Sequence, residues 1–278
     1  MRADYQQSVL MQLTPSNMPT HSLRSGAVRR QRRGQARYDG FTLIELAVVI
    51  MLITLLLGSI LVPLQAQVEQ RRVAETEKLF AEIKEALLGF AVTNGFFPCP
   101  AISATIGAED RITSGAGIGT CTGGKRQGFL PWVTLGLPKA DSWGNLFRYS
   151  VSPNFSNLNA LFGLTDKGDI TIQTRDALGN AVNLTVTTPS PEIPAMVLSH
   201  GKNGYGATSD SGIARALPMP VGTWGVTLDE FQNANNATLF WSRTHSENTG
   251  APGGEFDDIV MWISPSVLFS RMVAAGRF

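Results

Sequence analysis

One carboxylate stands inside the longest apolar stretch of the chain. Residues 41–62 form a run of 22 residues in which Glu45 is the only charged side chain. As a helix with a rise of ~1.5 Å per residue, this run measures roughly 33 Å, which matches the hydrocarbon core of a bilayer. A carboxylate in such a span is costly and usually has a function. The helix dipole also favours a glutamate in the first turn, but that does not explain its place at the head of an apolar run.

The net charge of the chain changes sign around this stretch. Residues 1–40 contain seven Arg and two Asp, a net charge of +5, whereas residues 41–278 contain 16 basic and 20 acidic side chains, a net charge of −4. Arginines next to an apolar span stay on the cytoplasmic side of a membrane, so the C-terminal bulk is predicted to be exported. An acidic exported part offers no basic surface, and we therefore expect no nucleic-acid partner.

Residues 96–128 form a loop rich in Gly, Ser, Thr and Pro that contains both cysteines of the chain, Cys99 and Cys121. An even cysteine count in an exported segment predicts one disulfide, which closes a loop of about 20 residues and stabilises the fold by roughly 3 kcal/mol. Two unrelated thiols or half of a metal site are the alternatives; zinc is disfavoured because no third cysteine is present. Residues 119–126 approach a phosphate-binding loop, but Arg126 stands where Ser or Thr is required, and no strand precedes it.

The dipeptide Ser199-His200 places a nucleophile beside a base. Neighbouring side chains on a strand point to opposite faces, and no Gly-x-Ser-x-Gly elbow surrounds the serine. A catalytic triad can also be formed by residues that are distant in the sequence, such as Asp257 and Ser211, and the sequence alone does not decide this possibility. A histidine in a turn is more often a hydrogen-bonded scaffold, and no complete constellation is present, so we predict that the protein is not an enzyme.

A seven-residue segment resembles the processing site of type IV pilins and of the pseudopilins of type II secretion. It reads Gly40-Phe41-Thr42-Leu43-Ile44-Glu45-Leu46. In that family a membrane peptidase cuts after the glycine and methylates the new terminal amine, which implies cleavage after Gly40 and methylation of Phe41. The glutamate at this position neutralises the terminal amine of a neighbouring subunit, which implies an assembly role for Glu45. A secretory signal peptide has a shorter apolar region and does not fit.

The resemblance implies an α+β, pilin-like fold, in which one long N-terminal helix, transmembrane in its first half, packs on an antiparallel β-sheet head. Pro63 is expected to kink or break this helix, because proline removes a backbone donor. The alternative start codon Met18 would shorten the leader. The expected parts are a cleaved basic leader (1–40), a transmembrane helix (41–62), its amphipathic continuation (63–94) and a periplasmic β-rich head (95–278).

Alternation of apolar and polar residues predicts the strands of the head. Residues 176–180 have the composition of a turn and should join two strands as a hairpin. Residues 141–145, Asp-Ser-Trp-Gly-Asn, resemble a turn of pseudopilin heads, and the polar residues 207–255 are expected to form an irregular surface loop. The predicted strands are residues 146–151, 169–175, 181–187, 194–199 and 257–263, followed by a short amphipathic helix within residues 265–278.

From the motif we expect a structural subunit, a minor pilin or pseudopilin of a type IV pilus or type II secretion filament. The expected partners are a prepilin peptidase, other pilin or pseudopilin subunits and the inner membrane, with the head in the periplasm. A tip-located binding pilin, acting in adhesion or DNA uptake, is the alternative from a different functional class. An exposed aromatic or basic patch within residues 207–255 would favour that alternative.

Calcium is the one cofactor that the resemblance raises, because major pseudopilins carry a calcium site in the C-terminal head. Carboxylate oxygens are ligands that calcium prefers, but the spacing of the acidic residues matches no EF-hand loop. No ligand is therefore assigned, and no other cofactor is expected. The candidate carboxylates are Asp210, Asp229, Glu230, Glu255, Asp257 and Asp258.

Overall fold

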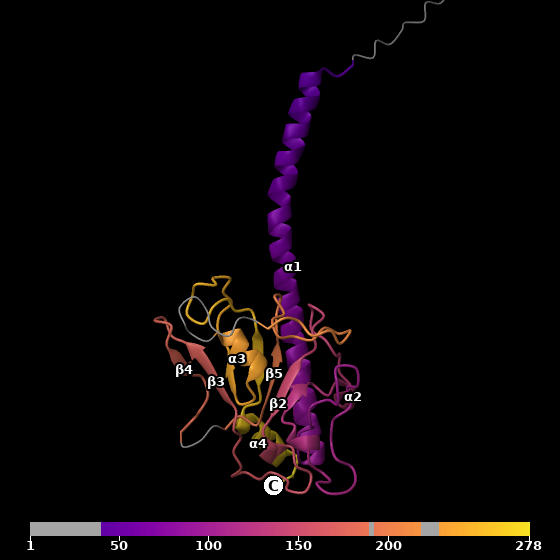
Figure 1. The fold of residues 1–278 in the computed structure, drawn as a ribbon, viewed down its shortest axis with the longest axis vertical. Helices are drawn as coiled ribbons and strands as arrows, with labels where there is room; N and C mark the ends of the chain where they lie inside the picture. Colours follow the sequence, from indigo (N-terminus) through magenta and orange to yellow (C-terminus); the bar gives the residue numbers. More distant parts are fainter. Residues whose placement is uncertain (1–39, 189–191, 218–227) are drawn as a thin grey trace, which may run out of the picture. The chain divides into compact units, whose positions relative to one another are not determined.

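The computed structural model describes residues 40–188, 192–217 and 228–278, except for the side chains of residues 59–64. The chain divides into two compact units, one up to Leu55 and one from Leu56 to Phe278. Helix α1 (Leu43–Asn94) begins in the first unit and ends in the second (Figure 1). All further helices and strands belong to the second unit, which is described below by itself.

The C-terminal part of helix α1 agrees with the prediction from the sequence. The three- and four-residue spacing of Phe80, Ile83, Leu87 and Phe90 predicts a buried stripe; the first three are buried and Phe90 is half-buried. The helix stops at Asn94, and Gly95 follows with φ 84°, a conformation that glycine adopts without strain. The helix is continuous through Pro63, so the prediction of a break at this residue is wrong.

Of the membrane span predicted at residues 41–62, all but Phe41 and Thr42 lies in the first part of α1. Among the residues that the structure describes, no helix combines the length and the apolarity of a membrane span. The transmembrane helix therefore stays a prediction from the sequence.

The first sheet of the head has four antiparallel strands in the order β1-β2-β5-β7. Its central strand β5 is completely buried, and its residue Val197 pairs with Tyr149 on one side and with Met261 on the other. The predicted strands at 146–151, 194–199 and 257–263 are confirmed, with shorter bounds. The strands are β1 (Gln127–Phe129), β2 (Arg148–Val151), β5 (Ala195–Ser199) and β7 (Ile259–Trp262).

The second sheet contains β4 (Ala181–Asn183), β3 (Thr171–Arg175) and β6 (Leu239–Trp241), in the order β4-β3-β6. The hairpin of β3 and β4 is confirmed, because the amide of Asp176 donates to the carbonyl of Asn180 across the predicted turn. Strand β6 pairs in parallel with β3, so the head is not purely antiparallel. Its presence within residues 207–255 also corrects the prediction of an irregular loop.

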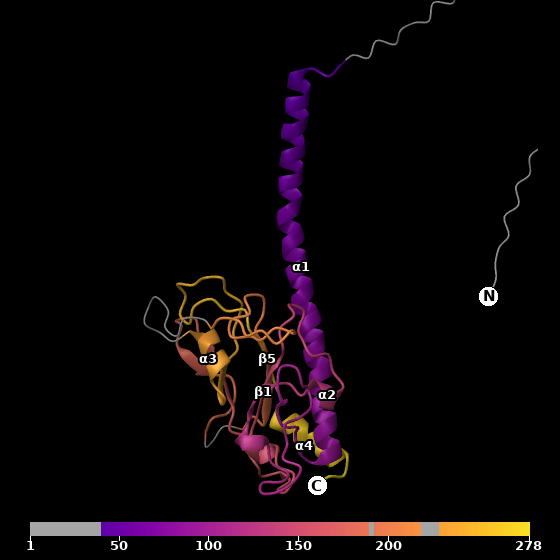
Figure 2. The same ribbon diagram turned by 45° about the vertical axis from the view of Figure 1, so that its right-hand side comes forward.

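Two apolar cores lie on the two faces of the first sheet. One core joins α1 and the C-terminal helix α4 (Pro265–Ala274) through Leu87, Val197 and Leu268, and the other joins the two sheets through Leu198 and Phe240. Figure 2 shows α1 and α4 on one side of β5, and α3 (Asp229–Asn235) on the other. Short elements complete the head, namely α2 (Trp132–Leu135) and the 3-10 turns Thr122–Gly124 and Pro153–Phe155.

Candidate functional site

The N-terminal motif forms a reciprocal cap on α1. The carboxylate of Glu45 accepts hydrogen bonds from the backbone amide of Thr42 at 3.0 Å and from its hydroxyl at 3.1 Å. In return, the amide of Glu45 donates to the hydroxyl of Thr42 at 3.2 Å. This geometry is a capping box, in which two side chains satisfy amides that have no partner within the helix. The Thr-x-x-Glu spacing is the sequence signal for this cap, which is not among the predictions made from the sequence.

The residues around the expected cleavage position are open to an enzyme. Phe41 is 84% exposed, and among the described residues other than its chain neighbours none has an atom within 4 Å of the position that a Cβ on Gly40 would take. Glu45 is exposed as well, and among the described residues its carboxylate is hydrogen-bonded to the two groups of Thr42. The contact of Glu45 with the terminal amine of a neighbouring subunit stays a prediction, because a single chain does not test it.

The structure contains the predicted disulfide between Cys99 and Cys121, whose Cα atoms lie 5.5 Å apart. The loop that it closes is organised around the buried side chain of Arg111. The guanidinium of Arg111 donates to the carbonyls of Phe97, Gly119 and Ser156. A buried cation is stable when it is paired and fully hydrogen-bonded, and Glu109 supplies the ion pair at 3.1 Å.

The two basic side chains that follow this loop, Lys125 and Arg126, form hydrogen bonds and ion pairs within the protein. The ammonium of Lys125 donates to the carbonyl of Ala101 and pairs with Asp110 at 3.2 Å. Both terminal nitrogens of Arg126 donate to the carboxylate of Asp169. Because neither cation is available for a phosphate, the arrangement agrees with the rejection of a nucleotide-binding loop.

The serine and histidine that could serve catalysis have separate partners. The hydroxyl of Ser199 donates to Asp141 at 2.6 Å, and both residues are buried. The imidazole of His200 faces Asp258, with 3.6 Å between Nδ1 and Oδ1. Ser211 shares a hydrogen bond with Ser209 near the surface. Within the described residues, no serine hydroxyl is hydrogen-bonded to a histidine, which a nucleophile and its base would require.

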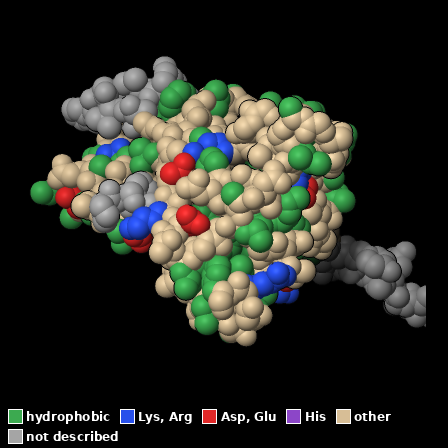
Figure 3. Space-filling model, turned by 90° about the horizontal axis from the view of Figure 1, so that it is seen from below, with side chains coloured by type: hydrophobic (Ala, Val, Ile, Leu, Met, Phe, Trp, Pro, Cys, Tyr) green, Lys and Arg blue, Asp and Glu red, His purple; other side chains and the backbone are tan. Residues whose placement is uncertain are grey.

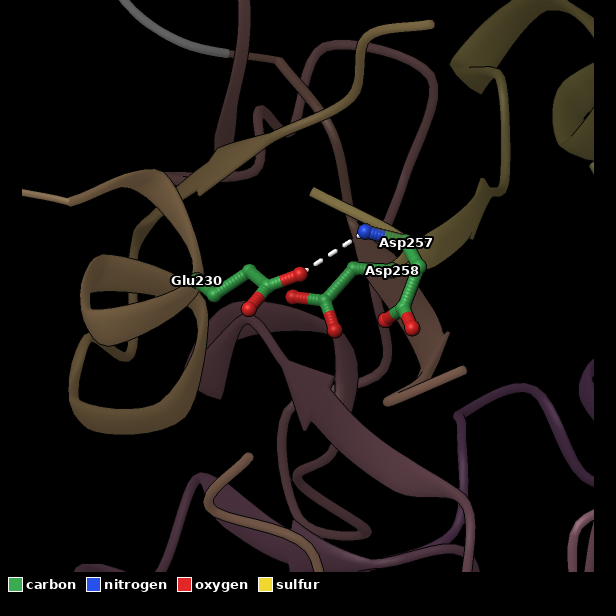
Figure 4. Close-up of side chains that lie close together, drawn as sticks. All are labelled: Glu230, Asp257 and Asp258. Atoms are coloured by element: carbon green, nitrogen blue, oxygen red, sulfur yellow. Dashed lines mark hydrogen bonds between the residues drawn. The ribbon is translucent and has the colours of Figure 1, made fainter. Parts of the chain in front are cut away.

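Three of the six candidate carboxylates lie together. Glu230 comes from α3, and Asp257 and Asp258 immediately precede β7; one oxygen from each lies within 4.8 Å of the other two (Figure 4). The amide of Asp257 donates to Glu230 at 2.7 Å, and this bond connects the two segments. We call these three residues the carboxylate cluster.

The Gly-rich turn that contains Asn203 holds the carboxylate cluster. The side-chain amide of Asn203 donates to both oxygens of Glu230 at 3.0 and 2.9 Å, and its backbone amide donates to Asp257 at 2.7 Å. Asn233 donates to Asp258 at 2.8 Å. Because α3, this turn and β7 are distant in the sequence, only the tertiary structure brings these groups together.

Burial makes the cluster electrostatically unusual. Desolvation, followed by the charge of Asp258, raises the pKa of Glu230 to about 9, and desolvation raises the pKa of Asp257 to about 7. Closely spaced buried carboxylates cannot all ionise without a compensating cation, so protons stay bound at neutral pH. The other titratable groups around the cluster are His200, Tyr205, Arg148 and Arg243.

The cluster has the donor chemistry that a hard divalent cation requires. Within the described residues, one oxygen of Asp257 and one of Asp258 are buried without a hydrogen-bond donor, and Nδ1 of His200, 3.6 Å from Asp258, also makes no hydrogen bond. Buried acceptors that lack donors are costly, and a cation with oxygen ligands would satisfy them. The three carboxylates therefore fit Ca²⁺ better than a metal that prefers nitrogen or sulfur ligands.

The other candidate carboxylates lie outside the cluster. Asp229 is completely buried and forms ion pairs with Arg175 at 2.6 Å and with Arg243 at 2.8 Å. These two cations compensate its charge, so Asp229 has a structural role. Asp210 and Glu255 are not part of the group that could hold a metal ion.

Comparison with known proteins gives a short and specific match. Residues 36–61 match the family model for the prokaryotic N-terminal methylation motif, the signature of type IV pilins and pseudopilins. No curated protein and no solved structure matches the chain significantly. The match thus covers the processing motif and the beginning of α1, and the fold of the head comes from the structure alone.

Proposed function

We propose that this chain is a structural subunit of a type IV pilus or type II secretion filament, a minor pilin or pseudopilin. The observation that carries the proposal is the methylation motif at residues 36–61, in which an exposed Gly40-Phe41 bond precedes a capped helix. The motif implies processing by a prepilin peptidase and assembly with other pilin subunits. In this proposal the apolar start of α1 anchors the precursor in the inner membrane, and the head lies in the periplasm.

The single carboxylate in the apolar run supports an assembly role for Glu45. Inside a membrane or a filament core, a carboxylate is tolerated when a cation pairs with it, and cleavage would create one at the amine of Phe41. We propose that Glu45 exchanges its contacts with Thr42 for the amine of a neighbouring subunit. No catalytic activity of the head is included in this proposal.

Intact-mass analysis of the protein purified from membranes of a host with an active prepilin peptidase tests the processing step. The expected mass is that of residues 41–278 with one added methyl group. A bulky replacement of Gly40 should leave the precursor uncut, whereas the same replacement at exposed Gly58 is the matched control. A wild-type chain that retains residues 18–40 beside an active peptidase contradicts the proposal.

A calcium site is a second proposal, supported by the buried carboxylate oxygens of Asp257 and Asp258 that accept no hydrogen bond among the described residues. Glu230, Asp257 and Asp258 would hold the ion, which would replace the bound protons and connect α3 to β7. Isothermal titration of the chelator-treated protein with Ca²⁺ tests this proposal. One bound equivalent is expected in the wild type and none in a Glu230→Ala variant.

The alternative of a DNA-uptake pilin receives less support. On the face seen in Figure 3, Lys and Arg side chains are scattered, and several of them lie beside Asp or Glu. Binding to a phosphate backbone requires several cations along one path. The mixed charge of this face does not favour such a ligand.

A further inference from the structure

Strand β7 has a free edge. Its partner in the sheet is β5, and no strand pairs with its other side in the described part of the chain. The amide of Ile263 donates to Ala195, which fixes the alternation of the antiparallel ladder. Val260 and Trp262 therefore point their amides and carbonyls away from β5. Such unpaired backbone groups are a template for an additional strand.

The edge is open because the segment before Ser246 and the segment after Phe256 diverge into different sheets. Ser246 and Phe256 exchange two backbone hydrogen bonds, at 2.9 and 2.8 Å, as the beginning of a ladder between their segments. The ladder does not continue, because the amide of Ser242 donates to Gln173 in the second sheet while β7 joins the first sheet. The two segments separate, and a groove lies along them.

The groove has a volume of about 570 Å³, within the range of pockets that bind ligands. One wall is helix α1 between Glu69 and Glu77. The segment from Ser242 to His245 and residues Ile259 and Val260 of β7 also line the groove. An edge strand beside a helix is the arrangement in which folded domains bind an extended peptide by strand addition.

The charge of the groove selects the ligand. The part of α1 that lines it carries two acidic side chains, Glu69 and Glu77, and no Lys or Arg, whereas Asp257 and Asp258 belong to the carboxylate cluster and Arg243 is paired with Asp229. Glu77 is exposed and has no ion-pair or hydrogen-bond partner among the described residues. A strand beside this wall would therefore be attracted by basic side chains.

The spacing of the helix wall defines the pattern of these side chains. Glu69 and Glu77 are separated by about 12 Å of helix rise. Two residues that are four positions apart on one face of a strand are separated by about 13 Å. Val73 lies between the two glutamates on the same wall, so the residue midway along the strand should be apolar.

We infer that the groove between α1 and β7 binds an extended segment of another protein as an additional strand of the first sheet. The segment carries Lys or Arg at two positions four residues apart and an apolar residue midway between them. Backbone hydrogen bonds to Val260 and Trp262 provide affinity, and the contacts with Glu69, Val73 and Glu77 provide selectivity. This binding function goes beyond the structural role proposed above and does not depend on it.

Fluorescence anisotropy with a labelled heptapeptide, TKTVTKT, blocked at both ends, tests this inference on the full chain in maltoside micelles. We expect saturable binding, and at least about tenfold weaker binding of the charge-inverted peptide TETVTET. Glu77→Gln should weaken binding roughly twofold to fivefold, the effect of one exposed ion pair. Glu82→Gln, on the same helix but outside the groove, is the matched control and should change nothing.

Two further measurements test the strand geometry. Val260→Pro removes an amide that faces the groove and not β5, so binding should be lost; the thermal unfolding midpoint should fall only by the packing that Val260 contributes to the second core. Should that variant unfold, peptides methylated on alternate backbone amides test the same bond with the wild-type protein. Methylation of the set that faces β7 should weaken binding at least about fivefold, and methylation of the other set should not. Equal binding of TETVTET, or equal effects of both methylated sets, would overturn the inference.

Discussion

Replacing Glu230 by Gln tests the electrostatics of the carboxylate cluster. The side chain is 1% exposed, and burial raises its pKa from 4.5 to about 9. A folded chain that binds a proton more tightly than the unfolded chain loses stability as pH rises above the unfolded pKa. The wild type should therefore lose free energy of unfolding from about pH 4.5 upward, and this loss should end near pH 9.

The magnitude follows from the shift of the pKa. Each pH unit between the two pKa values costs about 1.4 kcal/mol, so Glu230 contributes at most about 3 kcal/mol to the change from pH 5 to pH 7.5. For a folded unit of this size, that corresponds to a decrease of about 6–12 °C in the unfolding midpoint. Glutamine has no proton to lose, so the variant should lack the part of the slope that Glu230 contributes, whatever its absolute stability. Asp257, whose pKa is raised to about 7, keeps its own part below pH 7, so the difference between the two proteins is clearest between pH 7 and 9.

The assay is thermal unfolding of the full chain in maltoside micelles and chelator, followed by tryptophan fluorescence at several pH values. Glu247→Gln is the matched control, because its side chain is 79% exposed and should leave the slope unchanged. Equal slopes for the wild type and Glu230→Gln would refute the argument from burial. Added Ca²⁺ at pH 7.5 should raise the midpoint of the wild type and not of the variant, because the ion replaces the proton.

Three further predictions concern the rest of the chain. Cys121→Ser should lower the free energy of unfolding by about 3 kcal/mol, because it opens a loop of 22 residues, and alkylation before and after reduction of the wild type should differ by two thiols. Phe240→Ala should cost about 3–5 kcal/mol in chemical denaturation, since this side chain is completely buried between the two sheets. Glu45→Val should leave a cleaved membrane protein that is depleted from sheared filaments; incorporation equal to that of the wild type would contradict the assembly role.

The sequence by itself determined the features that depend on neighbouring residues. The motif from Gly40 to Leu46 predicts a processing site, because a peptidase reads a short linear segment, and the family match at residues 36–61 supports this motif. The stripe of Phe80, Ile83 and Leu87 predicts the buried face of α1, because helix periodicity is a local property. The turn at residues 176–180 predicts the β3–β4 hairpin for the same reason.

Only the tertiary structure decided which distant residues meet. Strand β6 escapes prediction because its partner β3 lies about 70 residues earlier, and a three-residue apolar run carries no signal of parallel pairing. Among six candidate carboxylates, the sequence could not separate the three that share a cluster from Asp229, which two arginines hold elsewhere. The groove beside β7 forms because the segment at Ser242 pairs with the second sheet while β7 belongs to the first. Burial, and with it the pKa of Glu230, is set by packing between segments, which a local pattern of residues does not encode.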